Sequence, residues 1–440
     1  MRLLTRKGNN SMAIQVKREM IVPASGKAIN ESRKQYYIDL DLTRREIRAV
    51  ESQSDTSDYS EYRDSHDNGK TWGPWIREKP ATKERLGEDD FAEGSYSGGN
   101  HIWNPVHRHF VSLRFMQIYV GGYEVATNDY WSGGRGESAH TYLDVTDSEG
   151  KNLSSTLVMY ENGPQFDKET YRESGFLDRN FGIGTFVSIM ECGDILFDLW
   201  IPVDVCCNMM GLDVQSVFPS VPKQPDALLI CRGKWNEKTL RYDLSFSPIV
   251  LDDRQSSRGI SEPVIAELKS GKILVVFRAS NLILSRWKPR ISPYAPGYKF
   301  YCLSDDGGKT FSPPMPWHFD SREVVYSPAT YALMFRSEAN GRLYWVGNIT
   351  DPTKTSSNFP RWPLQIVEVD EAWGVAKKDT LTVIDTRREG ETEQVQLSNF
   401  GLLQDRETGA VEIYLTKYGQ YPDRDVRDCE VWKYTVTLPR

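Results

Sequence analysis

Two short stretches of the sequence decide the fold: residues 65–72 read SHDNGKTW, and residues 304–311 read SDDGGKTF. Both fit the pattern S-x-D-x-G-x-T-aromatic, and two matches over eight positions are hard to obtain by chance. In such a stretch the aspartate and serine side chains can bond the amides of a turn, and glycine can adopt a positive φ. The aromatic ring can anchor the turn against the strands. We therefore interpret both stretches as structural hairpin turns and not as catalytic sites.

A weaker copy of this pattern indicates a repeat. Residues 146–153 read TDSEGKNL, which keeps the glycine but has serine where the aspartate should be. The three copies begin at residues 65, 146 and 304, so the second interval is close to twice the first. A repeat of about 80 residues would divide the 440 residues into five to six units. The sequence therefore predicts an all-β, six-bladed β-propeller of four-stranded antiparallel blades, with seven blades as the alternative.

The rest of the chain agrees with a fold of many short strands. Glycine and proline interrupt it every few residues, and the apolar stretches between them are rich in valine, isoleucine, tyrosine and phenylalanine. We expect residues 31–440 to form a single propeller domain. Residues 1–30 are expected to be an N-terminal segment that could complete the last blade.

Composition excludes several classes of function. The net charge of -7 comes from interspersed acidic and basic residues without a basic block, so we expect no nucleic-acid or membrane partner. The six cysteines show no CxxC spacing, and we expect neither a metal site nor a cofactor. The sequence shows no apolar run of transmembrane length and no secretion signal. We expect a secreted or periplasmic origin with the signal peptide missing from this chain, and the oligomeric state stays open.

A predicted hairpin around Gly271 brings two charged residues together. Two apolar stretches of similar length flank this glycine, so Glu262 and Arg278 must lie at the same end of the hairpin. A guanidinium can grip a carboxylate with two parallel hydrogen bonds, and it needs a negative neighbour when it is partly buried. If such hairpins are the first two strands of their blades, their open ends converge on one rim. Similar hairpins are predicted at residues 104–115, 327–348 and 398–418.

With these features the chain resembles the sialidase (neuraminidase) superfamily, whose propellers carry such turns as Asp-box, or BNR, repeats. The resemblance spans about residues 40–435 and rests on the two turns and on the run E-P-x-x-x-E-L-x-x-G that begins at Glu262 and leads to Arg278. In that family the glutamate supports a tyrosine nucleophile, and the arginine helps to clamp the substrate carboxylate. The resemblance implies a catalytic role for Glu262 and a substrate-binding role for Arg278. A plain structural salt bridge is the alternative.

Other positions of the family pattern are kept only in part. Arg361 follows the second turn motif and a loop, as the third family arginine does, which implies substrate binding. The first arginine lacks its usual setting, since residues 18–23 read REMIVP. The nucleophilic tyrosine is missing, because residues 394–400 read QVQLSNF, and Leu397 cannot be a nucleophile. Tyr418, at the far end of that hairpin, is a catalytic candidate in its place.

Three further residues are candidates for the same rim. Tyr326, before a Ser-Pro pair, could also replace the missing tyrosine or contact the substrate. In the family the general acid is an aspartate on a loop shortly before the first Asp box, where Asp55 and Asp58 lie in this sequence. Polar loops of this kind are usually just solvated, which is the plainer interpretation of both residues.

Histidines cluster at the start of a predicted inner strand, outside the family pattern. His101, His107 and His109 are three of only six histidines in the chain. Histidine titrates near neutrality, so one at the rim could act as acid or base on a uronate or a glycoside. We expect His101 to lie nearest the rim and keep it as a catalytic candidate.

Taken together, these residues favour an exo-acting glycoside hydrolase for a terminal sugar that we expect to be anionic. Two other functions stay open. A polysaccharide lyase acting on a uronate is favoured by the missing tyrosine and the extra histidines. A non-catalytic, glycan-binding propeller is possible because a fold does not determine a function. In each case the expected partner is a carbohydrate.

Overall fold

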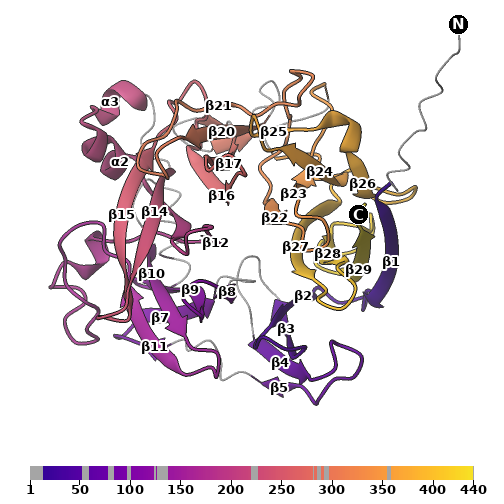
Figure 1. The fold of residues 1–440 in the computed structure, drawn as a ribbon, viewed down its shortest axis with the longest axis horizontal. Helices are drawn as coiled ribbons and strands as arrows, with labels where there is room; N and C mark the ends of the chain where they lie inside the picture. Colours follow the sequence, from indigo (N-terminus) through magenta and orange to yellow (C-terminus); the bar gives the residue numbers. More distant parts are fainter. Residues whose placement is uncertain are drawn as a thin grey trace, which may run out of the picture.

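The computed structural model describes residues 13–51, 59–77, 84–96, 101–122, 125, 137–219, 226–280, 282–284, 289–291, 297–353 and 358–439. Within these ranges the chain is nearly all-β, and its strands form six antiparallel blades arranged in a ring (Figure 1). The prediction of a six-bladed propeller is confirmed, and the seven-bladed alternative is wrong.

The blades follow one another along the chain. Blade 1 contains β2 (Asn30–Tyr37), β3 (Arg44–Glu51), β4 (Tyr59–Ser65) and β5 (Ile76–Arg77). Blade 2 contains β6 (Glu84–Arg85), β7 (Phe91–Tyr96), β8 (Ile102–Asn104), β9 (His109–Tyr119), β10 (Glu137–Thr146) and β11 (Asn152–Leu157). Blade 3 contains β12 (Val187–Ile189), β13 (Ile195–Pro202), β14 (Asp226–Asn236) and β15 (Arg241–Ile249).

The second half of the chain supplies the other three blades. Blade 4 contains β16 (Ile260–Glu267), β17 (Ile273–Ala279), β20 (Tyr298–Ser304) and β21 (Met315–Pro316). A separate hairpin of β18 (Leu282–Leu284) and β19 (Pro289–Ile291) follows β17. Blade 5 contains β22 (Leu333–Arg336), β23 (Leu343–Asn348), β24 (Leu364–Asp370), β25 (Val375–Ala376) and β26 (Thr382–Asp385). Blade 6 contains β27 (Gln396–Gln404), β28 (Val411–Tyr418) and β29 (Glu430–Thr437).

The first strand of the chain belongs to the last blade. β1 (Gln15–Val22) pairs with β29 from Gln15 opposite Thr437 to Met20 opposite Trp432. Blade 6 is thereby completed by the N-terminal part of the chain, and the chain then enters blade 1 next to it (Figure 1). This pairing closes the ring.

Helices are minor elements of the described chain. α2 (Val203–Met210) and α3 (Val214–Val217) lie on the outside of blade 3 (Figure 1). No helix in the described ranges has the length and apolar character needed to span a membrane.

The two turn motifs have the same hydrogen-bond pattern. In the first, the Ser65 hydroxyl donates to the Asp67 carboxylate (2.8 Å) and accepts from the Gly69 amide (2.8 Å). The Thr71 amide and hydroxyl both donate to Asp67, at 2.8 and 2.6 Å. These bonds lower the pKa of Asp67 to about 2. Residues 304–310 repeat the pattern with distances between 2.7 and 2.9 Å.

A buried ion cluster joins blade 1 to blade 6. Arg44, which is 2% exposed at the start of β3, donates to Asp405 (2.6 Å) and Glu412 (2.8 Å) of blade 6. Its Nε also donates to Asn68 in the first turn motif (2.7 Å). The cluster therefore connects a sequence-encoded turn to the place where the ring closes.

Replacing Arg44 should weaken this closure. In Arg44→Met the buried Asp405 carboxylate loses its cation and Glu412 keeps only Lys433 (2.7 Å), so we expect the free energy of unfolding to fall by about 3–5 kcal/mol. The control is Arg45→Met, because Arg45 and its partner Asp64 are 28% and 27% exposed, and such a pair contributes about 0–1 kcal/mol. Urea unfolding compares the two variants. Equal losses would contradict a special role for Arg44.

Candidate functional site

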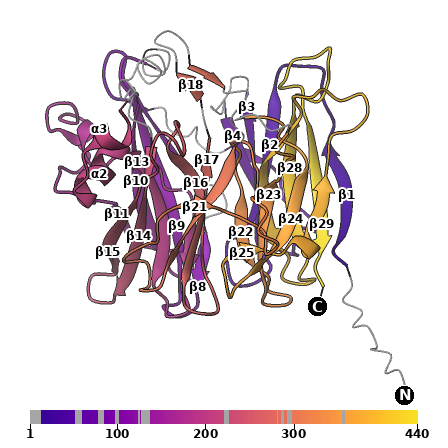
Figure 2. The same cartoon turned by 90° about the horizontal axis from the view of Figure 1, so that it is seen from above.

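A cavity of about 1030 Å³ opens at one end of the propeller. Most of its wall comes from residues that begin or precede the innermost strands β2, β12, β16, β22 and β27, and from the ends of β3, β17 and β28. The segments before β24 and β29, and one residue of β9, complete the described wall. Because paired strands run antiparallel, the start of an innermost strand and the end of the next strand meet at one end of each blade. In Figure 2 this is the end at which β18 lies, since β18 follows β17.

Glu262 and Arg278 lie together in this cavity. Their Oε2 and Nη1 atoms are 2.7 Å apart, and the side chains are 20% and 18% exposed. Glu262 has a φ of 50° and sits where the β16–β17 register shifts between Ser261 and Val264. A left-handed backbone at a non-glycine residue is strained, and such strain is concentrated at functional sites. The bulge aims the Glu262 carboxylate at Arg278 and fixes the guanidinium.

Arg361 reaches the same cavity from the loop before β24. Its Nη1 donates to the Gln396 side chain (2.9 Å), and its Nε donates to the Asn358 carbonyl (3.2 Å). Gln396 begins β27 and also lines the cavity, whereas Leu397 is completely buried in the core. Next to the place of the missing tyrosine, the chain therefore has a glutamine that holds Arg361.

Tyr418 lies in the cavity with a carboxylate beside it. Its hydroxyl donates to Glu51 of β3 (3.3 Å) and accepts from Asn30 of β2. Asn30 also donates to the same Glu51 oxygen (3.1 Å). Burial, together with the charge of Glu51, raises the pKa of Tyr418 far above its usual value. The tyrosine is therefore a neutral phenol at neutral pH, next to a base that can accept its proton.

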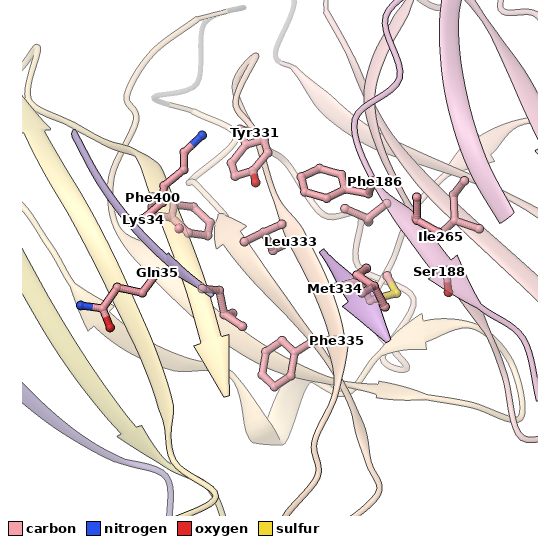
Figure 3. Close-up of a pocket in the computed structure, with 15 residues that line it drawn as sticks. Lys34, Gln35, Phe186, Ser188, Ile265, Tyr331, Leu333, Met334, Phe335 and Phe400 are labelled. Carbon is pink, nitrogen blue, oxygen red and sulfur yellow. The ribbon is translucent and has the colours of Figure 1, made fainter. Parts of the chain in front are cut away.

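Three aromatic rings form the floor of the cavity. The Tyr331 ring lies 5.6 Å from that of Phe186 and 5.4 Å from that of Phe400, as measured between centroids. Below them, nearer the middle of the ring of blades, is a smaller chamber of about 180 Å³ that is lined mainly by apolar side chains. Figure 3 shows the three rings at one end of this chamber and Phe335 at the other. The floor separates the two spaces.

Among the described residues that line the cavity, basic side chains outnumber acidic ones. The basic ones are Arg33, Lys34, Arg278, Arg361 and Arg427, and the acidic ones are Glu51 and Glu262. The protein as a whole carries a net charge of -7. Arg33 and Arg427 also pair with Glu31 and Asp425, which do not line the cavity, so the basic excess is partly neutralised. The excess that remains favours an anionic ligand at this place.

The structure places His101 elsewhere. It stacks on Phe110 of β9 with 4.2 Å between the rings, lies near Tyr36 of blade 1, and does not line the cavity. Among the three clustered histidines it lies nearest the cavity end, because His109 begins β9 at the far end. It precedes β8, which pairs with the first residues of β9, so it does not reach the cavity wall. None of the six histidines, all of which lie in described ranges, lines the cavity.

The remaining candidates are also outside the described cavity wall. Tyr326 forms an isolated bridge with Tyr298, and its carbonyl accepts from the Thr350 amide (2.9 Å). Asp55 and Asp58 lie outside the described residues. Among the described residues, no group of three or more His, Cys, Asp and Glu could hold a metal ion.

Sequence reasoning missed Glu51, Asn30 and Tyr331. Glu51 and Asn30 face each other at the open end of the β2–β3 hairpin. This contact is of the same kind as that of Glu262 with Arg278, so the same reasoning from hairpin ends predicts it. Tyr331 lies in the irregular segment before β22, and no pattern in the sequence marks it.

Comparisons with known proteins show the fold. No family model and no curated protein sequence matches this chain. Its structure is similar to that of a protein of unknown function from Dyadobacter fermentans, with 13% identity, 96% of this chain and 99% of that chain covered, and a TM-score of 0.57. It is also similar to the K499G mutant of NanB sialidase from Streptococcus pneumoniae, with 11% identity, 95% and 70% coverage, and a TM-score of 0.51. At these identities the similarity shows a shared propeller fold alone.

The buried histidines should make the protein sensitive to acid. Burial lowers the pKa of His101 to about 4, from 6.5 in an unfolded chain. The unfolded state therefore binds more protons between these values, so the stabilising contribution is present above pH 6.5 and is lost as the pH falls toward 4. We expect His101→Phe to lose less stability than the wild type over this range. Urea unfolding at several pH values measures it, and equal slopes would contradict the prediction.

Proposed function

We propose that the protein is an exo-acting glycoside hydrolase that removes a terminal anionic sugar from a glycan. The observation that carries this proposal is one cavity in which two arginines lie with a tyrosine that is hydrogen-bonded to a glutamate. Arg278 and Arg361 supply the positive charge, and Tyr418 and Glu51 supply the reactive pair. A guanidinium suits carboxylate recognition because its planar fork matches the two oxygens.

In this proposal the two glutamates have different tasks. Glu262 positions Arg278 by its ion pair, and Arg278 and Arg361 hold the carboxylate of the sugar. Glu51 accepts the proton of Tyr418 as the phenol oxygen attacks the anomeric carbon, which is the usual way to activate a weak nucleophile. A covalent intermediate followed by hydrolysis would retain the anomeric configuration. This differs from the roles that the family resemblance implied, where Glu262 would support the tyrosine.

The general acid of this reaction is proposed from the sequence alone. Asp55 and Asp58 come four and seven residues after Glu51 along the chain, and Glu51 ends its strand in the cavity wall. Either residue could protonate the leaving oxygen from that loop. Exo action is supported by the aromatic floor under the cavity, because a closed bottom suits the end of a glycan chain.

Fold similarity adds support at the level of the reaction class. NanB, which shares the fold, is a sialidase, although a fold by itself does not determine a function. An exported origin stays part of the proposal, since glycans are abundant outside the cytoplasm. None of the six histidines lines the cavity, so in the lyase alternative Tyr418 is the candidate base among the described residues.

The first test of the proposal compares the hydrolysis of anionic and neutral glycosides. We expect aryl glycosides of sialic acid or of uronic acids to release the phenol, and aryl glycosides of neutral sugars to be inert. The reason is that the cavity offers cations that only a charged sugar can use. Release is followed by absorbance. An unsaturated sugar product would show a lyase, and inertness toward every anionic glycoside and uronate-containing oligosaccharide would favour the glycan-binding alternative.

The reactive pair is tested by Tyr418→Phe, which removes one oxygen atom. On an active substrate we expect kcat to fall by about 10²–10⁴-fold, because the nucleophile is lost while the ring still fills its place. The control is Tyr62→Phe on the outer side of blade 1, which should leave kcat unchanged. Steady-state kinetics give both values. Full activity of Tyr418→Phe would show that another residue performs the attack.

A further inference from the structure

A lysine is buried directly behind the ion pair of the cavity. Lys299 of β20 is 1% exposed and lies opposite Arg278 in the β17–β20 register, so the two side chains leave the sheet on the same face. Its ammonium group donates to the Thr330 carbonyl (2.5 Å). Within the described part of the chain it forms no salt bridge. Lys299 is thus a buried amine whose one hydrogen-bond partner among the described residues is a neutral carbonyl.

The charges around Lys299 belong to the candidate site. Glu262 attracts the ammonium, whereas Arg278 and Arg361 repel it. Burial is the largest effect, and together these influences lower the pKa of Lys299 to about 7. Tyr331 follows the Thr330 contact and remains neutral, because burial raises its pKa far above the usual value.

We propose that Lys299 is a positioning residue that couples the binding of an anionic sugar in the cavity to the uptake of one proton. The inference rests on the proposed function, because it requires a carboxylate to bind at Arg278 and Arg361. Such a carboxylate brings a negative charge close to the Lys299 amine and stabilises its ammonium form. The amine then takes a proton from solvent, and no bond of the sugar changes in this step. The protonated lysine in turn strengthens the positive potential that holds the anion.

A purely structural role for Lys299 makes a different prediction. Its hydrogen bond to Thr330 also fixes the segment from Ala329 to Tyr331, which lines the cavity. Loss of that bond would weaken binding equally at every pH and would leave proton uptake as it was. Proton uptake therefore separates coupling from simple support.

The experiment is calorimetric titration of the intact protein with sialic acid and with glucuronate. At pH 7.5, in buffers of different ionisation enthalpy, we expect the wild type to take up about half a proton on binding. Lys299→Met should take up none. The matched control is Lys272→Met, because Lys272 is 41% exposed on the turn before β17 and pairs with Asp305. It should behave like the wild type.

The pH dependence of affinity provides a second readout. Between pH 6 and pH 9 the wild-type Kd should rise about tenfold as Lys299 loses its proton, whereas the Kd of Lys299→Met should stay nearly constant. Lys299→Arg keeps a permanent cation, so it should bind the anion without uptake of a proton. This second variant tests the coupling even if Lys299→Met fails to fold.

Each outcome decides between the proposals. Binding with equal proton uptake in the wild type and Lys299→Met would overturn the coupling and leave the proposed function intact. Failure of the wild type to bind either sugar acid would overturn both. A proton titration of the ligand-free protein adds an independent check. If the wild type and Lys299→Arg do not differ by one group that titrates near pH 7, Lys299 is not the coupled residue.

Discussion

The antiparallel pairing of the first two strands in each blade is the constraint on which the site depends. It places the start of β2, β16 and β27 beside the end of β3, β17 and β28, at one end of the molecule. The ring then brings these hairpin ends around one cavity. The turns with the S-x-D-x-G-x-T-aromatic pattern lie at the other end, where they connect strands and, through Asn68, contact the ion cluster of Arg44. The turns that support the fold and the residues of the proposed reaction therefore lie at opposite ends of the same blades.

Local sequence patterns predicted the side-chain contacts that depend on a single hairpin. The contact of Glu262 with Arg278 follows from two strands of equal length around Gly271, and the structure has it at 2.7 Å. The pairing of Tyr418 with Glu51 could not be predicted in this way, because it joins blade 6 to blade 1. It depends on ring closure by β1 and β29, which no local pattern encodes.

The errors also have physical causes. His101 was expected close to the rim at the start of an inner strand. The strand that follows it, β8, pairs only with the first residues of β9, whereas the cavity is lined farther along β9 by Phe115, so His101 does not reach the cavity wall. The sequence does contain a sign that Lys299 is unusual. It stands alone as a charged residue in the apolar run YKFYC at residues 298–302, and a charge in a buried strand requires an explanation. The aromatic floor around Tyr331 comes from three different blades, so only the folded chain shows it.

One cavity contains both the arginines proposed to bind an anion and a neutral tyrosine with its carboxylate partner. The most direct test of this account is to trap the covalent intermediate with a fluorinated anionic sugar that forms it quickly and hydrolyses it slowly. Mass spectrometry of the digested protein then locates the label. The account predicts one sugar on the peptide that contains Tyr418, and none after Glu51→Gln. A label on any other residue, or turnover of the reagent with no label at all, would contradict it.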